Sequence, residues 1–281
     1  MSTGKLPAFS PEDIQALQPA MKIGLLATVN PEGLPHLTLI ASLRANTPTQ
    51  LTFGQFIEGT SKGFLHQNPR AGFLVMTLDR NLWRGKATFT HTARQGPEFE
   101  LYNNQPMFRY NAYFGVHTVY YLDLVEQSGR GALPMGRVVA AALQTMAARA
   151  TRRPAGEAMN PWTQALLNKL GNLKFLATVD GDGYPRIVPV IQAQAAGAGE
   201  VLFAASVYAE DLEAIPSGVP AALLGMSLRM EDVLVRGRYQ GLRRVAGQRC
   251  GIVQVDWVYN PMPPTPQQIY PPLPLEPVTA W

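Results

Sequence analysis

The sequence predicts a mainly β (α+β) protein built from two tandem copies of one β-barrel or β-sandwich unit. Three observations lead to this fold class. Two hairpin-like segments have nearly the same sequence, matching features recur at a constant spacing, and many short strand-like runs alternate with few helices. Each copy has a length of about 130 to 150 residues, which is typical of a single domain.

The two hairpin-like segments are the clearest part of the repeat. LLATVNPEGLPHLTLI covers residues 25–40, and FLATVDGDGYPRIVPV covers residues 175–190. In each, an apolar and β-branched run leads into a turn and a second apolar run follows. Pro31 presets φ for the first turn, and Gly33 and Gly183 can take the positive φ that closes each one. Both segments are therefore predicted to be β-hairpins.

The constant spacing extends well beyond the hairpins. Ser10-Pro11 and Asn160-Pro161 each place a capping residue before a proline at the first helical position, and the two pairs are 150 residues apart. Phe53, in LTFGQ, and Phe203, in VLFAAS, are separated by the same 150 residues. Because the helix, the hairpin and a later strand share this spacing, the sequence indicates a tandem repeat of one structural unit.

The sequence divides into a first unit at 1–150, a second unit at 151–260 and a proline-rich arm at 261–281. The arm is predicted to be extended and polyproline-like, packed on its own protein or docked on a partner. In the first unit a short helix is predicted from Thr60, as its cap, through Gln67. Two further helical segments are predicted around residues 98–113 and 134–150.

Composition excludes several classes of protein. No apolar run approaches the roughly 20 residues of a membrane span, and the N-terminal residues lack a secretion signal, so we expect a cytoplasmic protein without membrane contact. The net charge of +4 comes from scattered basic residues, which disfavours nucleic acid as a partner. Cys250 is the only cysteine, and we interpret it as a buried structural thiol. The four histidines lack the close spacing of metal ligands, so no metal site is expected.

Four segments of the first unit occur in a familiar order: ATVNPEGLPHLTLI, LTFGQ, TSKGFLHQNPRAGFLV and RGKATF. Together they resemble the pyridoxamine 5′-phosphate oxidase-like, FMN-binding split-barrel family, and the second unit matches it more weakly. In that family a six-stranded Greek-key split barrel with small helices pairs with a second barrel, and FMN lies in the groove between them. The resemblance implies two tandem split barrels packed as an intrachain pseudo-dimer. Assembly into a further homodimer is left open.

The resemblance also implies a set of cofactor-binding residues. The residues that bind phosphate in the family correspond here to two hydroxyl residues and a lysine at the start of the short helix. The family's second-strand residues, which contact the phosphate and the flavin, correspond to three residues in the second strand of the first hairpin. A later arginine matches a polar contact to the ring edge that could stabilise a reduced anionic flavin, and a tryptophan of the second unit could cover the flavin. These residues are Thr60, Ser61 and Lys62; Thr38, Leu39 and Ile40; Arg80; and Trp257.

Simpler interpretations of the same residues stay open. Lys62 could be a solvated surface lysine, Thr38 could reflect β-propensity alone, and Trp257 could be a core or interface residue. This chain also has threonine and serine where the family has arginine.

The second unit differs at the positions that match the phosphate ligands. Residues 150 further along the chain are Glu210, Asp211 and Leu212. Two acids would repel a phosphate. We therefore expect one of the two grooves to have lost its phosphate end, so that each chain binds one flavin.

The function these residues favour is FMN-dependent oxidation or reduction of a small molecule, with no residue standing out as a catalytic base. Family members that oxidise pyridoxamine phosphate end in an arginine- and histidine-bearing segment, whereas this chain ends in its proline-rich arm, which argues against that substrate. One alternative is a non-enzymatic protein that binds flavin, a deazaflavin or haem, with a lone histidine as axial ligand. The histidines are His36, His66, His91 and His117. The other alternative is a cofactor-free interaction module.

Overall fold

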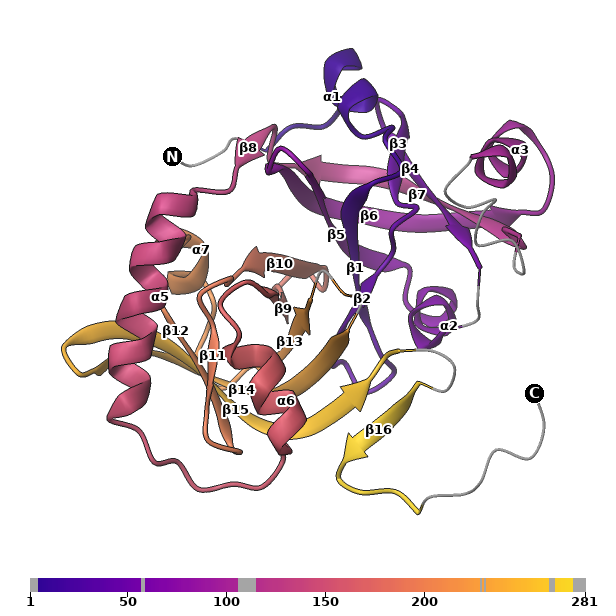
Figure 1. Ribbon diagram of the computed structural model, residues 1–281. Coiled ribbons are helices and arrows are strands. Elements are labelled where there is room, and N and C mark those ends of the chain that lie inside the picture. The colour runs from indigo at the N-terminus through magenta and orange to yellow at the C-terminus, as the bar shows by residue number, and fades with distance from the viewer. Residues whose placement is uncertain are drawn as a thin grey trace. The chain divides into compact units, whose positions relative to one another are not determined.

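The computed structural model describes residues 5–56, 59–105, 115–227, 229, 231–262 and 266–274. It contains two antiparallel eight-stranded sheets (Figure 1). The first has the strand order β2-β1-β5-β6-β7-β4-β3, with β8 on β6, and the second has the order β10-β9-β13-β14-β15-β12-β11, with β16 on β15. The two orders become identical when β1 to β7 are matched to β9 to β15. The predicted mainly β fold and tandem repeat are therefore confirmed.

The elements of the first repeat are α1 (Pro11–Ala16), β1 (Lys22–Val29), β2 (Pro35–Leu39), β3 (Arg44–Thr47), β4 (Gln50–Gln55), α2 (Thr60–Gln67), β5 (Arg70–Thr77), β6 (Asn81–Ala93), α3 (Pro97–Asn104), β7 (Thr118–Gln127) and β8 (Gly131–Ala132). Those that follow are α5 (Met135–Ala150), α6 (Pro161–Asn168), β9 (Leu173–Val179), β10 (Pro185–Pro189), β11 (Gln194–Ala196), β12 (Glu200–Ala204), α7 (Ala209–Glu213), β13 (Pro220–Met226), β14 (Asp232–Val245), β15 (Gln248–Asn260) and β16 (Gln267–Tyr270).

Local sequence signals form the hairpins and the first helix of each repeat as predicted. Gly33 and Gly183 have φ values of 77° and 81° in the β1–β2 and β9–β10 turns. At the helix starts, the Ser10 hydroxyl accepts a hydrogen bond from Asp13 N at 3.1 Å, and Asn160 Oδ1 accepts one from Thr163 N at 2.8 Å. Each cap satisfies an amide that the helix itself leaves unpaired.

Two predicted segments differ in part from the structure. Within the described residues the segment 98–113 is helical as α3, and residues 106–113 of that prediction lie outside the described residues. The arm is not purely polyproline-like, because β16 pairs with β15, with Asn260 opposite Gln267. The described part of the arm thus packs on its own sheet, where ladder hydrogen bonds replace water.

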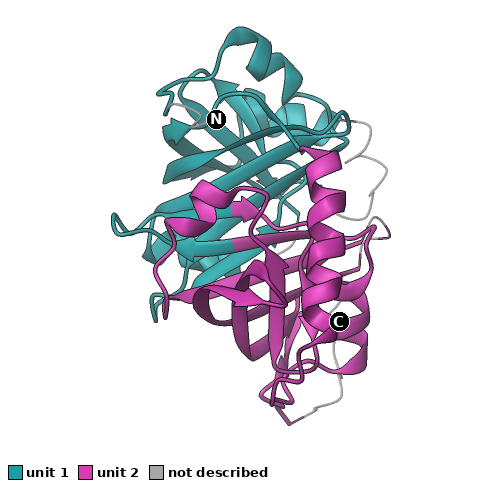
Figure 2. Ribbon diagram, turned by 90° about the vertical axis from the view of Figure 1, so that its left-hand side faces the viewer, with its two compact units in different colours: residues 1–133, 177–187 teal, residues 134–176, 188–281 magenta. Residues whose placement is uncertain are grey.

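The chain divides into two compact units whose limits differ from the sequence repeats (Figure 2). Unit 1 contains residues 1–133 and 177–187, and unit 2 contains residues 134–176 and 188–281. Helix α5 packs in unit 2, where the Thr145 hydroxyl accepts a hydrogen bond from Ala204 N at 2.9 Å. The tip of the β9–β10 hairpin, residues 177–187, packs in unit 1. Repeat and compact unit are therefore not the same segment of chain.

An ion cluster holds the hairpin tip in unit 1. Lys86, on β6, is 7% exposed, and its Nζ lies 2.8 Å from an Asp180 carboxylate oxygen and 2.7 Å from one of Asp182. Burial alone lowers the pKa of Lys86, but the hydrogen bonds and attraction of the two acids outweigh it and hold that pKa above its usual value. Arg186 also donates to Asp180, at 3.0 Å. The buried cation is thus matched by acids from a segment that follows it by more than 90 residues.

Backbone and aromatic contacts fix the same hairpin tip. The Tyr184 hydroxyl lies 2.8 Å from the Thr88 hydroxyl. A Cβ atom built on Gly72 would lie 2.2 Å from the carbonyl oxygen of Pro185, so the two backbones approach more closely than any larger residue allows. Hydrogen bonding and close packing therefore supplement the ion cluster.

Unit 2 contains a fully buried lysine with no acidic partner among the described residues. Lys174 is 0% exposed, and its Nζ donates to the carbonyl oxygens of Lys169 at 2.9 Å and Ile191 at 3.2 Å. Burial lowers the pKa of Lys174 to about 8 because removal from water disfavours the charged form. Protonating this side chain in the folded state therefore costs stability.

Within the described residues, no helix is both long and apolar enough to cross a membrane.

We predict that Lys86→Met will lower the urea midpoint of unfolding by an amount that corresponds to roughly 1 to 3 kcal/mol, because it leaves Asp180 and Asp182 without their shared cation. Glu126 lies 3.8 Å from Lys86 Nζ and 2.9 Å from Lys5 Nζ, and the Lys5 side chain is 74% exposed, so Lys5→Met is the matched control. Solvent-exposed ion pairs contribute little to the free energy of unfolding. Equal midpoints for the two variants would contradict the role given to Lys86.

We also predict a pH dependence of stability from Lys174. Its folded-state pKa of about 8 is below the value of about 10.4 for an unfolded chain, so the unfolded state binds more protons between these values and stability rises as the pH increases through this window. Between pH 7.5 and 9.5 this lysine should add roughly 1 to 2 kcal/mol. Urea titrations should show a smaller rise for Lys174→Met than for the wild type or Lys5→Met. An unchanged rise would mean that Lys174 is not the titrating group.

Candidate functional site

The start of α2 has the features of an anion-binding site. The helix follows β4, and its N-cap, Gly59, has a φ of −153° and provides no side-chain cap. Thr60 was predicted to be the cap, but it is the first helical residue, and its hydroxyl lies 3.3 Å from Nε2 of the buried His36. Without a side-chain cap, the first-turn amides and the positive end of the helix dipole favour an anion here.

Strand β2 carries a second hydroxyl to the same place. The Thr38 and Ser61 hydroxyls form a hydrogen bond, and Ser61 is only 3% exposed. Only one hydrogen lies between two hydroxyl oxygens, so the other hydroxyl still has a hydrogen to donate. The structure therefore brings together Thr38, Thr60 and Ser61, which the sequence predicted as neighbours in a site.

Lys62 places a positive charge over the helix start. The side chain is half-buried, and a Cβ atom built on Gly59 would lie 3.8 Å from Lys62 Nζ, so the ammonium group folds back along the first turn. A cation at the positive end of a helix is unfavourable for the helix itself. A bound anion would make the charge of Lys62 favourable at this position. Lys62 is therefore the central electrostatic feature of the cluster.

The remaining predicted residues of β2 have a different environment. Leu39 is half-buried opposite Leu25, and Ile40 is 8% exposed just after the strand. The Ile40 amide already donates to the Gly24 carbonyl oxygen at 2.7 Å, and the Ile40 carbonyl oxygen accepts from Leu43 N at 3.0 Å. Ile40 therefore cannot donate its amide to a ligand without losing an internal hydrogen bond.

Arg80 lies outside this cluster. Thr38 is opposite Leu26, which is opposite Phe73, and about 13 Å of strand separates Phe73 from Thr77. Arg80 lies beyond Thr77, exposed in the β5–β6 turn with a positive φ of 64°. Its conformation, uncommon for a residue other than glycine, marks a tight turn at the far end of the sheet.

Trp257 belongs to unit 2 and is enclosed by its own neighbours. The Arg236 guanidinium lies 3.5 Å from its ring centroid, and the Tyr259 ring stacks at 5.3 Å. The indole N–H donates to Gln268 on β16 at 2.8 Å. A half-buried tryptophan with these contacts has a packing role within the second sheet.

The second repeat forms a short helix at the position that matches α2, with a different charge. Helix α7 has Glu210 and Asp211 in its first turn, and its cap, Tyr208, has a φ of 54°. Leu212, the match of Lys62 in the sequence, is fully buried in the second core. The lysine of the first repeat is thus replaced by a core residue, and its two hydroxyl residues are replaced by acids.

The histidines and the cysteine have local structural contacts. His66 packs edge-on against Phe89 at 5.1 Å, His91 stacks on Tyr121 at 4.4 Å, and His117 hydrogen-bonds the Thr118 hydroxyl at 2.8 Å. Cys250 is buried, as predicted, and burial raises its thiol pKa to about 11. The described part of the chain gathers no group of three or more His, Cys, Asp or Glu side chains that could hold a metal ion.

No model of a protein family and no curated protein matches this chain. Matching solved structures include an FMN-binding protein from Syntrophomonas wolfei subsp. wolfei, with 14% identity, a TM-score of 0.35, and coverage of 43% of this chain and 86% of that protein. A putative pyridoxamine 5′-phosphate oxidase from Lactobacillus delbrueckii has 16% identity, a TM-score of 0.32, and coverage of 44% and 97%. An F420 reductase has 13% identity, a TM-score of 0.31, and coverage of 44% and 98%. Each match spans less than half of this chain and most of the other protein.

We predict that the Thr38–Ser61 hydrogen bond stabilises the docking of α2 on β2. A double-mutant cycle with Thr38→Val and Ser61→Ala should give a coupling of about 0.5 to 1.5 kcal/mol in unfolding free energy, because each single change removes the same bond. Thr47→Val, in an exposed part of β3, is the control partner for Ser61→Ala and should show no coupling. Strictly additive effects of Thr38 and Ser61 would exclude the bond.

Proposed function

We propose that this protein binds FMN, with the flavin phosphate at the start of α2, and uses it as an oxidoreductase for a small molecule. The observation that carries the proposal is the cluster of Lys62 with the Thr60, Ser61 and Thr38 hydroxyls around an uncapped helix start. The resemblance of the first repeat to FMN-binding split barrels supports the choice of FMN among phosphate-bearing ligands.

The residues present fit a phosphate group. Lys62 supplies a full positive charge, and one hydroxyl of the Thr38–Ser61 pair retains a donor hydrogen. The helix has no side-chain cap, and although the Lys62 amide already donates to the Gly59 carbonyl oxygen at 3.1 Å, the positive end of the helix dipole favours the phosphate. Arg80 lies outside this group, and the sequence-based prediction that it contacts the flavin ring stays a prediction, as does that for Trp257.

When bound, FMN supplies the redox chemistry at its isoalloxazine ring. The residues of this chain have simpler tasks, which are to neutralise the phosphate and to anchor it through hydroxyl and amide donors. The buried His36 ring lies beside Thr60, with Nε2 3.3 Å from that hydroxyl. The location of the flavin in a groove between the two barrels, and the substrate class, stay predictions from the sequence.

The composition of α7 supports one flavin per chain. Its first turn carries Glu210 and Asp211 where α2 carries Thr60 and Ser61, and its five residues make a single turn. Two carboxylates at this position would repel a phosphate. The second repeat then contributes structure and no second phosphate site.

We predict that Lys62→Glu will weaken FMN binding by at least about tenfold, since it replaces an attractive charge with a repulsive one at a helix start. The measurement is the visible absorption spectrum of the purified protein, followed by titration with FMN and quantitation of bound flavin per chain. Lys169→Glu is the control, because it makes the same change of charge at an exposed position in unit 2. Leu212→Lys is unsuitable as a control because it would place a charge in the second core.

The wild type should bind close to one FMN per chain, and unchanged affinity in Lys62→Glu would refute the phosphate placement. A Soret band in the purified protein would favour haem, and tighter binding of a deazaflavin than of FMN would change the cofactor. Absence of binding for all three would leave the interaction module as the better function.

A further inference from the structure

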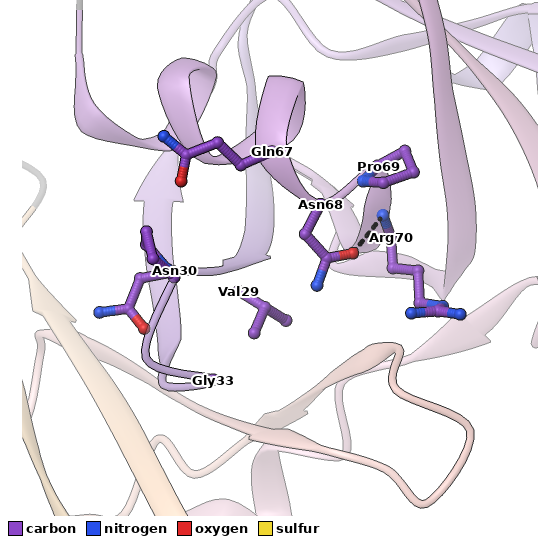
Figure 3. Close-up of a pocket in the computed structure, with 8 residues that line it drawn as sticks. Val29, Asn30, Gly33, Gln67, Asn68, Pro69 and Arg70 are labelled. Atoms are coloured by element: carbon purple, nitrogen blue, oxygen red, sulfur yellow. Dashed lines mark hydrogen bonds between the residues drawn. The ribbon is translucent and has the colours of Figure 1, made fainter.

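A polar cleft lies in unit 1 at the opposite end of α2 from the phosphate cluster. Its volume is about 420 Å³, within the range of small-molecule sites. The β1–β2 turn supplies Val29, Asn30, Pro31 and Gly33, and the segment that ends α2 and begins β5 supplies Gln67, Asn68, Pro69 and Arg70. Figure 3 shows the side-chain amides and the arginine arranged around Val29.

Arg70 is the only charged residue in the lining of this cleft, and it forms no ion pair within the described part of the chain. Its guanidinium is held in place by the hairpin tip. The group lies 5.7 Å from the Tyr184 ring centroid, and a Cβ atom built on Gly183 would be 3.3 Å from its Nη1. An arginine that is positioned by stacking keeps its fork of donors for a planar anion such as a carboxylate.

The amides supply neutral hydrogen-bonding groups beside this charge. Asn68 Oδ1 accepts from Arg70 N at 3.2 Å, which leaves the Asn68 NH2 group for the cleft. Asn30 Oδ1 accepts hydrogen bonds from the Glu32 and Leu34 amides within the turn, and its side-chain NH2 group donates one hydrogen bond to the Glu32 carboxylate at 3.1 Å. The Glu32 carboxylate therefore already has a partner. The Gln67 side chain is exposed. Amides that both donate and accept suit hydroxyl groups.

The end of α2 sets the orientation of a ligand. The last carbonyl groups of a helix lack intrahelical partners and carry partial negative charge, so they repel anions and accept hydrogen bonds from hydroxyls. An anionic group would therefore lie at Arg70, and hydroxyl groups would lie at Gln67 and Asn68. Val29, Pro31 and Pro69 add apolar contacts to the carbon chain between them.

We propose that this cleft is a second ligand site, distinct from the flavin phosphate site, that binds a small hydroxylated anion through Arg70 and the Asn30, Gln67 and Asn68 amides. The shared chemistry is one anionic group and several hydroxyls, which a hydroxycarboxylate or a sugar phosphate would provide. A bare inorganic anion or a neutral sugar offers only half of these interactions.

The test is calorimetric titration of the full chain with tartrate, ribose 5-phosphate, orthophosphate and ribose. The titrations are made in the wild type and in the Lys62→Glu background, where the start of α2 no longer attracts a phosphate. At least one of the two hydroxylated anions should bind in both backgrounds, and more tightly than orthophosphate or ribose. Which one binds identifies the anionic group as carboxylate or phosphate.

Substitutions then assign the site to the cleft. Arg70→Gln should weaken binding by about tenfold, because a charge-assisted fork of hydrogen bonds is lost, and Arg70→Lys should restore part of it. Arg94→Gln, an exposed arginine outside the cleft, is the control and should leave affinity unchanged. The proposal is overturned if Arg70→Gln binds as the wild type does, if the bare ions bind as tightly, or if Lys62→Glu abolishes binding.

Discussion

Unit 1 depends on the contact between a buried cation and two acids that come from a distant part of the chain. Lys86 cannot be buried as a charge without partners, and Asp180 and Asp182 provide them from the β9–β10 turn. Once the turn is held there, Pro185 closes on Gly72 and Tyr184 reaches Thr88. Tyr184 in turn positions Arg70 at the polar cleft. A hairpin of the second repeat is therefore a structural part of the first unit, and it shapes a surface that the first repeat alone would leave open.

The two candidate sites of unit 1 lie at opposite ends of helix α2, and the two ends of the helix suit different chemical groups. Its start combines Lys62 with hydroxyl groups, which suits a strongly charged phosphate, whereas its end presents amides and carbonyl groups, which suit hydroxyls. The helix has eight residues, so its ends are about 12 Å apart. The Thr38–Ser61 hydrogen bond joins the start of the helix to β2, and the β1–β2 turn lines one cleft together with the end of the helix. In the second repeat α7 is shorter and acidic, so the same fold there supports neither arrangement.

The sequence predicted the features that depend on neighbouring residues. The hairpin turns, the Ser10 and Asn160 caps and the end of α2 at Gln67 all follow from interactions within a few positions, and the repeated spacing predicted that one unit occurs twice. The errors arose where a partner is remote in sequence. Thr60 was expected to cap α2, but its hydroxyl instead meets His36, 24 positions earlier. Asp180 and Asp182 were recognised only as turn residues, because nothing local indicates that Lys86 will be buried beside them, and the pairing of β16 with β15 was hidden by proline-rich composition. The cleft went unpredicted because the chain has no local signal that joins the β1–β2 turn to Arg70.

The membership of residues 177–187 in unit 1 has a consequence for how the protein is made. All strands of the first sheet have been synthesised by residue 132, and Glu126 on β7 then lies 3.8 Å from Lys86 Nζ. The two nearer acids, Asp180 at 2.8 Å and Asp182 at 2.7 Å, follow some 50 residues later. At rates of about 5 to 20 residues per second, the nascent first unit would wait for several seconds with a cation on a surface that is not yet covered. An amino-terminal half that must wait in this way cannot be a finished folding unit on the ribosome. Duplication of the repeat has thereby coupled the two halves in time as well as in sequence, since the second must emerge before the first is complete.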